Sequence, residues 1–450
     1  MVDEASQRSL LEKPMLRLIA ALSIPSIFGM LFAGINTLVD AIYVASMLDG
    51  RALAAITIAY PLTQIFNAVA SLVGFGAATL LSTGIASNDR RRQSLIIASA
   101  AALSVIMALS LSLAVLLTIT DVLGLFGIDG QTLDYAEQFM RAFSHGGVFL
   151  ITALVLNVLI RSLGNMRFAM LTFAIAFGCN VILAPIFIST FDDGLVGAAW
   201  ANNLSMALLL LMNLRILRGI EASREFLSDF WRQFWAYSLQ IFAMGTPYLL
   251  LFLLNISQLY IINYIISDIG TSADLAVFGV LNRIFMLALL PVYGMSRAMQ
   301  PIVSANFGAD NSPRVHEALR YFMIIGTLGL ASVLGIASLF SHDVMAVFGS
   351  SVAPAPEFQI YFWLYALATA FSPIPILSLT YFQAIGRMNL ASLLVLIRQV
   401  IGFLPLVFIM TESHQIYGIF IALLLSDIIA SSAAIFFLAK GGHGFFAKKH

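Results

Sequence analysis

Hydrophobic residues occur along the chain in twelve long runs that short polar segments separate. A helix needs roughly 20 apolar residues to cross a hydrocarbon core of about 30 Å, and each run is at least that long. The runs predict transmembrane helices near residues 15–47, 52–87, 93–119, 132–160, 167–190, 197–217, 236–267, 273–304, 320–341, 356–385, 389–411 and 416–439. The predicted fold class is therefore an all-α polytopic membrane protein with twelve transmembrane helices.

Composition narrows the functional classes. Hydrophobic residues make up 60% of the chain and charged residues 10%, whereas soluble chains have roughly 45–50% and about 25%. Little of the chain is left for a soluble domain, which argues against a globular enzyme. The 23 basic and 23 acidic residues cancel, so no overall field would attract nucleic acid.

An intramembrane enzyme and an ion channel are two other possible classes. An enzyme would need a nucleophile beside a base, or His, Asp and Glu residues at metal-ligand spacing, and the sequence has no such cluster. A channel would need a repeated filter segment, and none is visible. We therefore predict no enzyme activity, no metal and no cofactor.

Positive charge is concentrated on one side of the predicted membrane. Basic residues precede the first helix (Arg8, Lys13, Arg17), follow the second (90–92) and end the chain (Lys448, Lys449), whereas the opposite loops are mainly acidic. Cytoplasmic loops carry an excess of Lys and Arg. Both termini are therefore predicted to lie in the cytoplasm.

The chain repeats itself at an offset of 222 residues. This offset superposes Pro25 on Pro247 and the stretch 163–166 (LGNM) on 385–388 (IGRM). The predicted organisation is an N-terminal six-helix lobe (1–218), a polar cytoplasmic linker (219–235), and a C-terminal six-helix lobe with a short cytoplasmic tail (236–450). Because six is an even number, the two repeats are parallel, and we expect a site between them.

Four stretches carry a family resemblance. They are INTLVDAIYVASMLDGRALAAI (35–56), LGNMRFAMLTFAIAFGCNVILAPIFI (163–188), GLVGAAWA (194–201) and PVYGMSRAMQPIVSANFGAD (291–310). They resemble the multidrug and toxic compound extrusion (MATE) family, in particular its DinF-like prokaryotic branch, and the resemblance covers essentially the whole chain. It implies a V-shaped pair of six-helix bundles around a central cleft. It also implies a monomer in the bacterial inner membrane that exports organic cations and other amphiphiles in exchange for inward H⁺ or Na⁺.

The first half carries the predicted cation site, because polar side chains at membrane depth are functional candidates by default. Asp40 lies about 14 Å below the outer surface, one helical turn beyond Asn36, while Asn180 and Asn202 fall in the same outer half. A carboxylate in a low-dielectric site can hold a proton at ordinary pH and release it when the site opens to water. A structural role for Asp40, tying helices together, is the alternative.

The resemblance sharpens this site and also shows two departures from the family pattern. Asp40 matches the acidic residue of the family's first helix, and Asn180 matches an Asn of its fifth. However, Ala184 stands where the branch usually has a second carboxylate, and Asn202 stands where Thr is usual. A single carboxylate among amides favours H⁺ over Na⁺ as the coupling ion, or indicates that the coupling is weakened or rearranged.

The second half supplies candidates for substrate contact. Asn255, followed by Gln258, occupies the place where the resemblance to another MATE branch implies an acidic residue. Arg283 and Arg398 lie near the midplane, and Asp427 is close enough in depth for a long Arg side chain to reach it. One interpretation is a buried ion pair that fixes helix packing. The other is an Arg exposed in the cleft that favours anionic, zwitterionic or polar substrate groups.

These observations predict a secondary active exporter of small amphiphilic or cationic compounds, driven by cation antiport through alternating access. The competing hypothesis is a flippase or exporter of amphiphilic or lipid-linked anionic substrates, in which the midplane Arg residues would bind phosphate.

Overall fold

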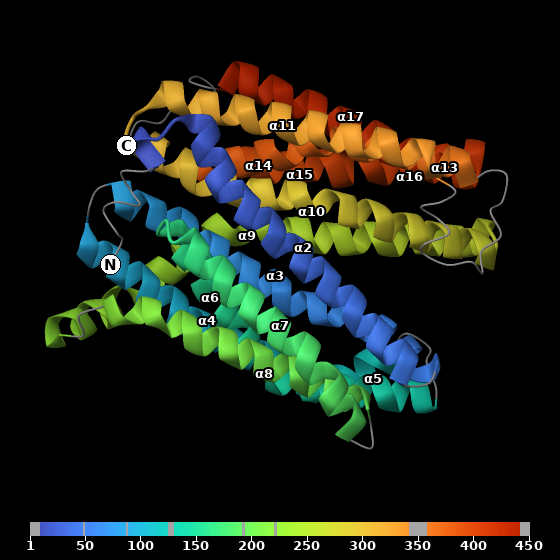
Figure 1. Cartoon of the computed structure of the whole chain (residues 1–450), viewed down its shortest axis with the longest axis horizontal. Coiled ribbons are helices and arrows are strands. Elements are labelled where there is room, and N and C mark those ends of the chain that lie inside the picture. Colours follow the sequence, from blue (N-terminus) through green and yellow to red (C-terminus); the bar gives the residue numbers. More distant parts are fainter. Residues whose placement is uncertain are drawn as a thin grey trace. The chain divides into compact units, whose positions relative to one another are not determined.

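The computed structural model describes residues 10–47, 50–86, 89–124, 130–190, 194–219, 223–341 and 358–441. All regular elements in these residues are helical (Figure 1). They are α2 (Met15–Met47), α3 (Gly50–Ala86), α4 (Arg90–Gly124), α5 (Gln131–His145), α6 (Gly147–Ser162), α7 (Met166–Thr190), α8 (Leu195–Asn213), the 3₁₀-helix η1 (Leu214–Gly219), α9 (Arg224–Ile269), α10 (Ser272–Gly308), α11 (Ser312–Leu339), α13 (Phe358–Phe371), α14 (Pro373–Ala384), α15 (Met388–Leu396), the π-helix η2 (Ile397–Phe403), α16 (Leu404–His414) and α17 (Ile416–Gly441).

The number of membrane spans agrees with the sequence-based prediction. Within the described residues, eleven helical stretches are long and apolar enough to cross a membrane. The pair α5–α6, bent by 53° at Gly146, makes a twelfth if it counts as one span. Each predicted run overlaps one of these spans, so the all-α, twelve-helix prediction is confirmed.

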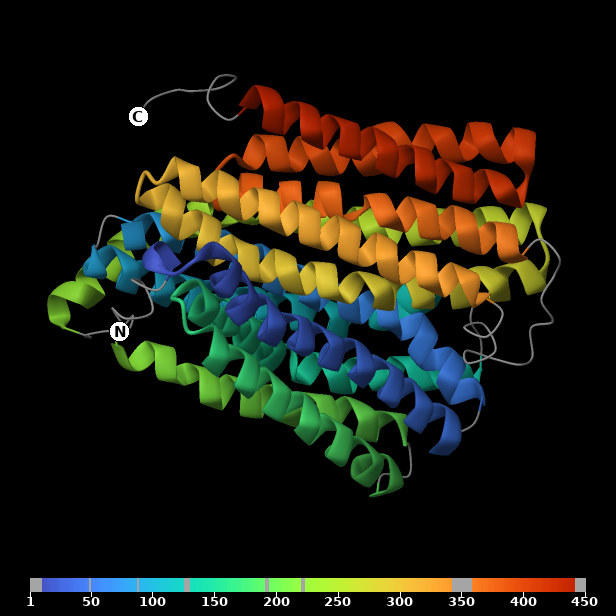
Figure 2. The ribbon, with the colours of Figure 1, turned by 45° about the horizontal axis from the view of Figure 1, so that its top comes forward.

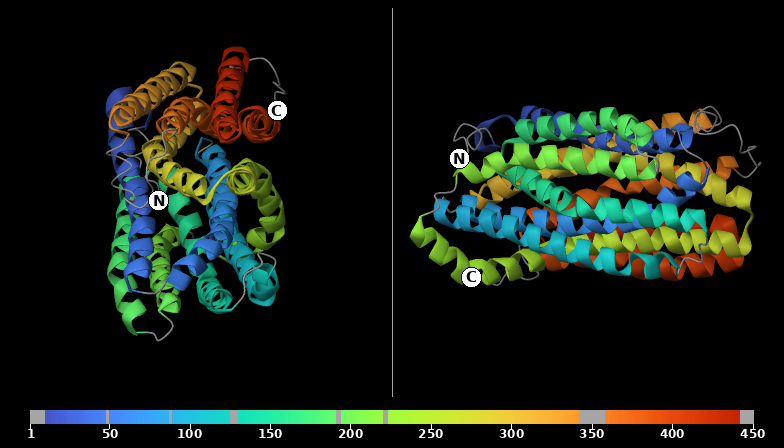
Figure 3. Two further views of the ribbon diagram at one scale, coloured as in Figure 1. Left: turned by 90° about the vertical axis from the view of Figure 1, so that its right-hand side faces the viewer. Right: turned by 90° about the horizontal axis from the view of Figure 1, so that it is seen from below.

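The chain forms two compact units. Unit 1 contains Met1–Lys13 and Phe28–Leu249, and unit 2 contains Pro14–Ile27 and Leu250–His450. In unit 1, α7 lies beside α8 and α3 beside α6. In unit 2, α16 lies beside α17 and α10 beside α11 (Figure 2). The long helices of each unit run side by side, as the end-on view in Figure 3 shows.

The two units have separate hydrophobic cores. The core of unit 1 is built mainly from small and aliphatic side chains of α3, α4 and α6. The core of unit 2 is richer in aromatic rings, with Phe285 in contact with Phe362 and Tyr365, and Phe420 in contact with Tyr361. Aromatic packing thus fixes α10, α13 and α17 around the polar network described below.

Two helices pass from one unit to the other at equivalent positions. The start of α2, up to Ile27, belongs to unit 2, and the start of α9, up to Leu249, belongs to unit 1. These two residues are related by the 222-residue offset, and each follows by two residues one of the paired prolines, Pro25 and Pro247. The repeats are therefore linked by a reciprocal exchange of helix starts.

Glycines allow the close helix contacts at these starts. A Cβ atom at Gly245 of α9 would lie 2.0 Å from the Leu72 carbonyl oxygen of α3, and one at Gly294 of α10 would lie 2.7 Å from the Ile27 Cα of α2. Small residues permit such backbone approach in membrane helices. Gly294 occupies the second-repeat position equivalent to Leu72, so the two contacts are related by the repeat.

The predicted linker over 219–235 is helical from Arg224 onward, since α9 begins there. Phe226, Phe230 and Phe234, spaced four residues apart, form the inner face of this part of α9. Phe226 and Phe234 are buried, and Phe230 and Phe234 belong to the core of unit 1. The polar residues between them obscured this periodicity. The part of the predicted linker from Arg224 onward is thus a packed helix.

We predict that Gly245→Ala destabilises the protein. The added methyl group would collide with backbone, which cannot move aside as a flexible side chain can, and overpacking typically costs about 1–3 kcal/mol. The apparent Tm in detergent should fall by at least about 2–4 °C. The matched control is Gly279→Ala in α10, where a Cβ atom meets nothing within 4 Å. Equal melting temperatures for the two variants would contradict the close approach of α9 and α3.

Candidate functional site

The break between α5 and α6 is held by a side chain of α8. A Cβ atom at Gly146 would lie 2.0 Å from the Asn203 Oδ1, so only glycine leaves room for this amide. Asn203 Nδ2 donates a 2.8 Å hydrogen bond to the Ala142 carbonyl, which the bend leaves without its helical partner. Asn203 was not among the predicted residues. The sequence feature that indicates this break is the pair Gly146-Gly147 inside the predicted span 132–160.

Two residues of the predicted cation site, Asn180 and Asn202, lie on the adjacent helices α7 and α8. The backbones of these helices approach closely at Gly197 of α8 and Phe187 of α7. A Cβ atom added at Gly197 would lie only 2.3 Å from the Phe187 carbonyl oxygen. From this point Asn180 lies seven residues back along α7, about 10 Å, and Asn202 five residues along α8, about 8 Å. The two helices run in opposite directions, so both amides lie at nearly the same depth. Asn180 and Ala184 are buried, and Asn202 is half-buried.

The remaining two residues of that site are Asn36 and Asp40. Both belong to the backbone of α2, but their side chains lie outside the part of the structure that is described. Their participation in a cation site remains a prediction.

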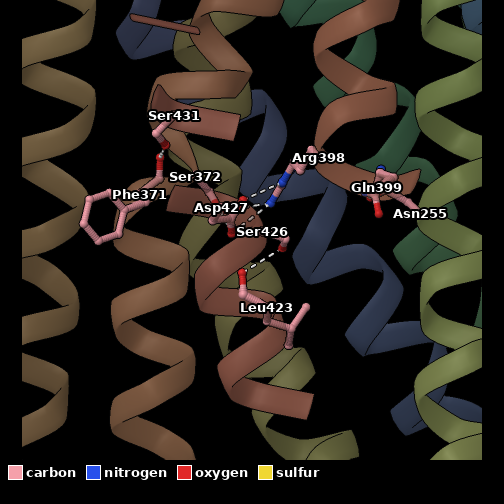
Figure 4. A network of polar contacts seen from close by, with 9 residues as sticks. All are labelled: Asn255, Phe371, Ser372, Arg398, Gln399, Leu423, Ser426, Asp427 and Ser431. Carbon is pink, nitrogen blue, oxygen red and sulfur yellow. Dashed lines mark hydrogen bonds and ion pairs between the residues drawn. The ribbon is translucent and has the colours of Figure 1, made fainter. Parts of the chain in front are cut away.

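Two of the C-terminal candidates, Arg398 and Asp427, form a buried polar network with Ser372 (Figure 4). Arg398 Nε donates to Asp427 Oδ1 at 2.5 Å, and Arg398 Nη2 donates to Asp427 Oδ2 at 3.2 Å and to Ser372 Oγ at 3.1 Å. Ser372 Oγ donates to Asp427 Oδ2 at 3.0 Å. The ion-pair interpretation of Arg398 and Asp427 is thus the one that the structure shows. Ser372 lies in the break between α13 and α14.

A π-helix positions this arginine. The wider turn of η2 carries both Arg398 and Gln399, and π-helical turns are frequent at functional sites. Gln399 Nε2 donates a 2.8 Å hydrogen bond to Asn255 Oδ1 of α9. Asn255 is exposed on α9, and Gln258, one turn later, is half-buried. Gln399 and the π-helix were missed, because neither a π-turn nor the direction of one Gln can be recognised from hydrophobicity.

The two arginines of α10 differ from Arg398. Arg283 is exposed on α10 and belongs to no ion pair among the described residues. Arg297, which was not among the predicted residues, is half-buried on the same helix and also has no ion pair in the described part of the chain. The sequence does mark Arg297 as a candidate, because it is a charged residue inside the predicted span 273–304.

Two tyrosines also interact with the Arg398–Asp427 pair. Tyr293 and Tyr365 are close enough to interact electrostatically with both charged groups. The Tyr365 hydroxyl donates to Asn282 Oδ1 at 3.0 Å. The arrangement holds a neutral ion pair with hydrogen-bonding groups around it. In the described residues, no group of three His, Cys, Asp or Glu side chains could hold a metal ion.

We predict that Arg398→Met and Asp427→Leu each lower the free energy of unfolding by about 3–5 kcal/mol, because each leaves one buried charge without its partner. The double variant removes both charges and should recover much of this loss. Thermal unfolding in detergent measures all three. Glu137→Gln serves as a control, since Glu137 pairs with Arg141 at 2.8 Å in a more exposed position, where pairs contribute about 0–1 kcal/mol. A double variant that loses the sum of both single effects would contradict the pairing.

Comparisons with known proteins place these elements in a family. The MatE family model matches residues 25–186 and 247–408. These two stretches have the same length and the same 222-residue offset, which confirms the predicted repeat.

Relatives match along nearly the whole chain. The multidrug export protein MepA of Staphylococcus aureus is 22% identical over 444 residues, covering 94% of this chain and 93% of MepA. The FAD transporter of Shewanella oneidensis is 26% identical over 453 residues, covering 96% of each protein.

Solved structures share the fold. The outward-facing conformation of a multidrug resistance MATE family transporter of the MOP superfamily superposes with a TM-score of 0.86 at 24% identity, covering 95% of this chain and 96% of that one. A MOP superfamily transporter from Pyrococcus furiosus gives 0.83 at 23% identity, covering 96% and 97%. Because the family model matches well over half of the chain, the protein belongs to the MatE family and is a MATE transporter, not an enzyme.

Proposed function

We propose that this transporter is a secondary active exporter of small amphiphilic or cationic compounds, driven by H⁺ antiport through alternating access. The observation that carries this proposal is the arrangement in unit 1, where Asn180 and Asn202 lie at one depth on paired helices beside a buried Ala184. The amides supply hydrogen-bonding groups inside the membrane, and Asp40 of α2 is the carboxylate that would use them.

Ala184 determines the choice of ion. Sodium needs several oxygen ligands and is favoured by nearby negative charge, which a second carboxylate at this position would supply. A methyl group at Ala184 removes that charge. The site then keeps a single carboxylate among neutral amides, and a single carboxylate can exchange one proton with water as its surroundings change.

The relatives support the substrate class. MepA is named a multidrug export protein, and a multidrug exporter needs a binding surface that accepts varied apolar shapes. This chain has 18 Met and 35 Phe residues, and flexible Met side chains suit such adaptable surfaces. We further propose that the protein is a monomer in the bacterial inner membrane, with both termini in the cytoplasm.

A second candidate function is export of anionic amphiphiles, including lipid-linked ones. The specific observation in its favour is the pair of arginines on α10, Arg283 and Arg297, which lack ion-pair partners among the described residues. Guanidinium groups bind phosphate through two parallel hydrogen bonds. The relative named FAD transporter agrees with this alternative, and translocation of labelled phospholipid or FAD, compared with that of a cationic drug, distinguishes the two.

We predict that Asp40→Asn abolishes transport driven by a pH gradient. The amide keeps the size of the side chain but cannot exchange a proton, so uptake of a fluorescent cationic drug into inverted vesicles should fall at least about tenfold. Asp268→Asn, which changes an exposed acid near the end of α9, is the matched control and should transport normally. Normal transport by Asp40→Asn would show that this carboxylate has only a structural role.

A further inference from the structure

The first part of α9 extends beyond the membrane core. The helix has 46 residues, or about 69 Å at 1.5 Å per residue, against about 30 Å of hydrocarbon. The stretch Glu225–Ile269 is apolar enough to cross a membrane and is longer than one perpendicular crossing needs. The segment that starts at Arg224 therefore lies at the surface where α9 enters the bilayer.

This segment has two apolar faces. Phe226, Phe230 and Phe234 form the face that packs into unit 1. Trp231, Trp235 and Leu239 form a second stripe, also spaced by four residues, and are 71%, 69% and 68% exposed. Each tryptophan ring packs edge-on against the preceding phenylalanine, with centroid distances of 5.2 Å and 5.3 Å. Each exposed ring on the outside of the helix thus contacts the phenylalanine beside it in the sequence.

Basic groups border the tryptophan stripe. Asp229 pairs with Arg91, at the start of α4, and with Arg232, and the two arginine side chains are 56% and 77% exposed. Two guanidinium groups therefore share one carboxylate, which leaves positive charge at the surface. Further exposed arginines lie at the ends of neighbouring elements of unit 1: Arg90 on α4, Arg167 on α7, and Arg215 and Arg218 on η1.

We propose that Trp231, Trp235 and Leu239, with Arg91 and Arg232, form a binding surface for anionic phospholipids of the leaflet in which α9 begins. Tryptophan favours the boundary between headgroups and acyl chains, because its ring is apolar and its N–H still reaches water. A phosphate group above the rings lies within reach of guanidinium groups, which bind it as a charge-assisted, bidentate pair. Under the proposed orientation this is the cytoplasmic leaflet, where basic residues near the surface are attracted to anionic lipids.

Quenching of tryptophan fluorescence tests the proposal without any transport assay, so its failure is separate from failure of the proposed function. The chain has four Trp residues, and Trp200→Phe with Trp363→Phe leaves only Trp231 and Trp235. This parent is reconstituted in phosphatidylcholine vesicles that contain a fixed fraction of either brominated phosphatidylglycerol or brominated phosphatidylcholine. We expect stronger quenching by the anionic lipid, corresponding to at least about a fivefold preference, as about 1 kcal/mol per arginine implies.

The matched variants identify the residues responsible. Adding Arg91→Gln and Arg232→Gln to the parent should remove the preference and leave quenching by brominated phosphatidylcholine unchanged, which also shows that the helix is still inserted. Arg17→Gln with Arg320→Gln removes equal charge from exposed positions of unit 2 and should keep the preference. Equal quenching by both lipids overturns the proposal, as does an absence of quenching. Competition by soluble glycerol phosphate would assign the surface to free anions instead and overturn it as well.

Discussion

Polar groups inside a membrane must find their partners within the protein, and the helix breaks of both units depend on this constraint. The bend at Gly146 releases the carbonyl of Ala142, and Asn203 of α8 binds it. The break at Ser372 is bound by Asp427 of α17, and Ser431 of α17 donates to the carbonyl of Phe371 at 3.2 Å. In each unit the last long helix of the repeat thus holds the break in the fourth span. At such a break, backbone carbonyl groups within the membrane lose their helical hydrogen bonds and can bind other polar groups. In a straight helix the same carbonyls would be hydrogen-bonded within the helix.

The two units meet this constraint with different chemistry. Unit 1 uses neutral amides, including the buried network in which Asn157 donates to the Ala169 carbonyl and Thr172 donates to Asn213. Unit 2 uses an ion pair inside an aromatic core, and the charges of Arg398 and Asp427 cancel. The proposed placement of Asp40 among the amides of unit 1 would suit reversible protonation. A closed ion pair suits a fixed structural contact, because opening it would leave a charge without a partner.

Much of the fold could be predicted from the sequence. Long apolar runs give the spans, because bilayer thickness sets helix length, and paired prolines and glycines give the repeat. Counting residues from the helix ends gave Arg398 and Asp427 similar depths in the membrane, and the structure shows them paired. Other features depend on side-chain direction, which hydrophobicity does not encode. Polar residues between the phenylalanines at the start of α9 hide its helical periodicity, and Gln399 gains its position from a π-turn.

The candidate site was predictable only in part for the same reason. Asn180 and Asn202 could be assigned to one depth by counting residues, and the pairing of α7 with α8 supports that assignment. Asn203, the neighbour of Asn202, was missed because its role depends on a glycine in another helix. Arg297 was passed over because a charge in a long apolar helix can face protein, lipid or water, and the sequence does not distinguish these.

The central claim is that a single carboxylate makes this transporter proton-coupled. The most direct test compares wild type and Ala184→Asp in proteoliposomes, with pH and sodium gradients imposed separately and drug uptake followed by fluorescence. The account predicts that a pH gradient alone drives the wild type and that the variant, which regains a second carboxylate, also responds to sodium. Uptake by the wild type that follows the sodium gradient and ignores the pH gradient would contradict it.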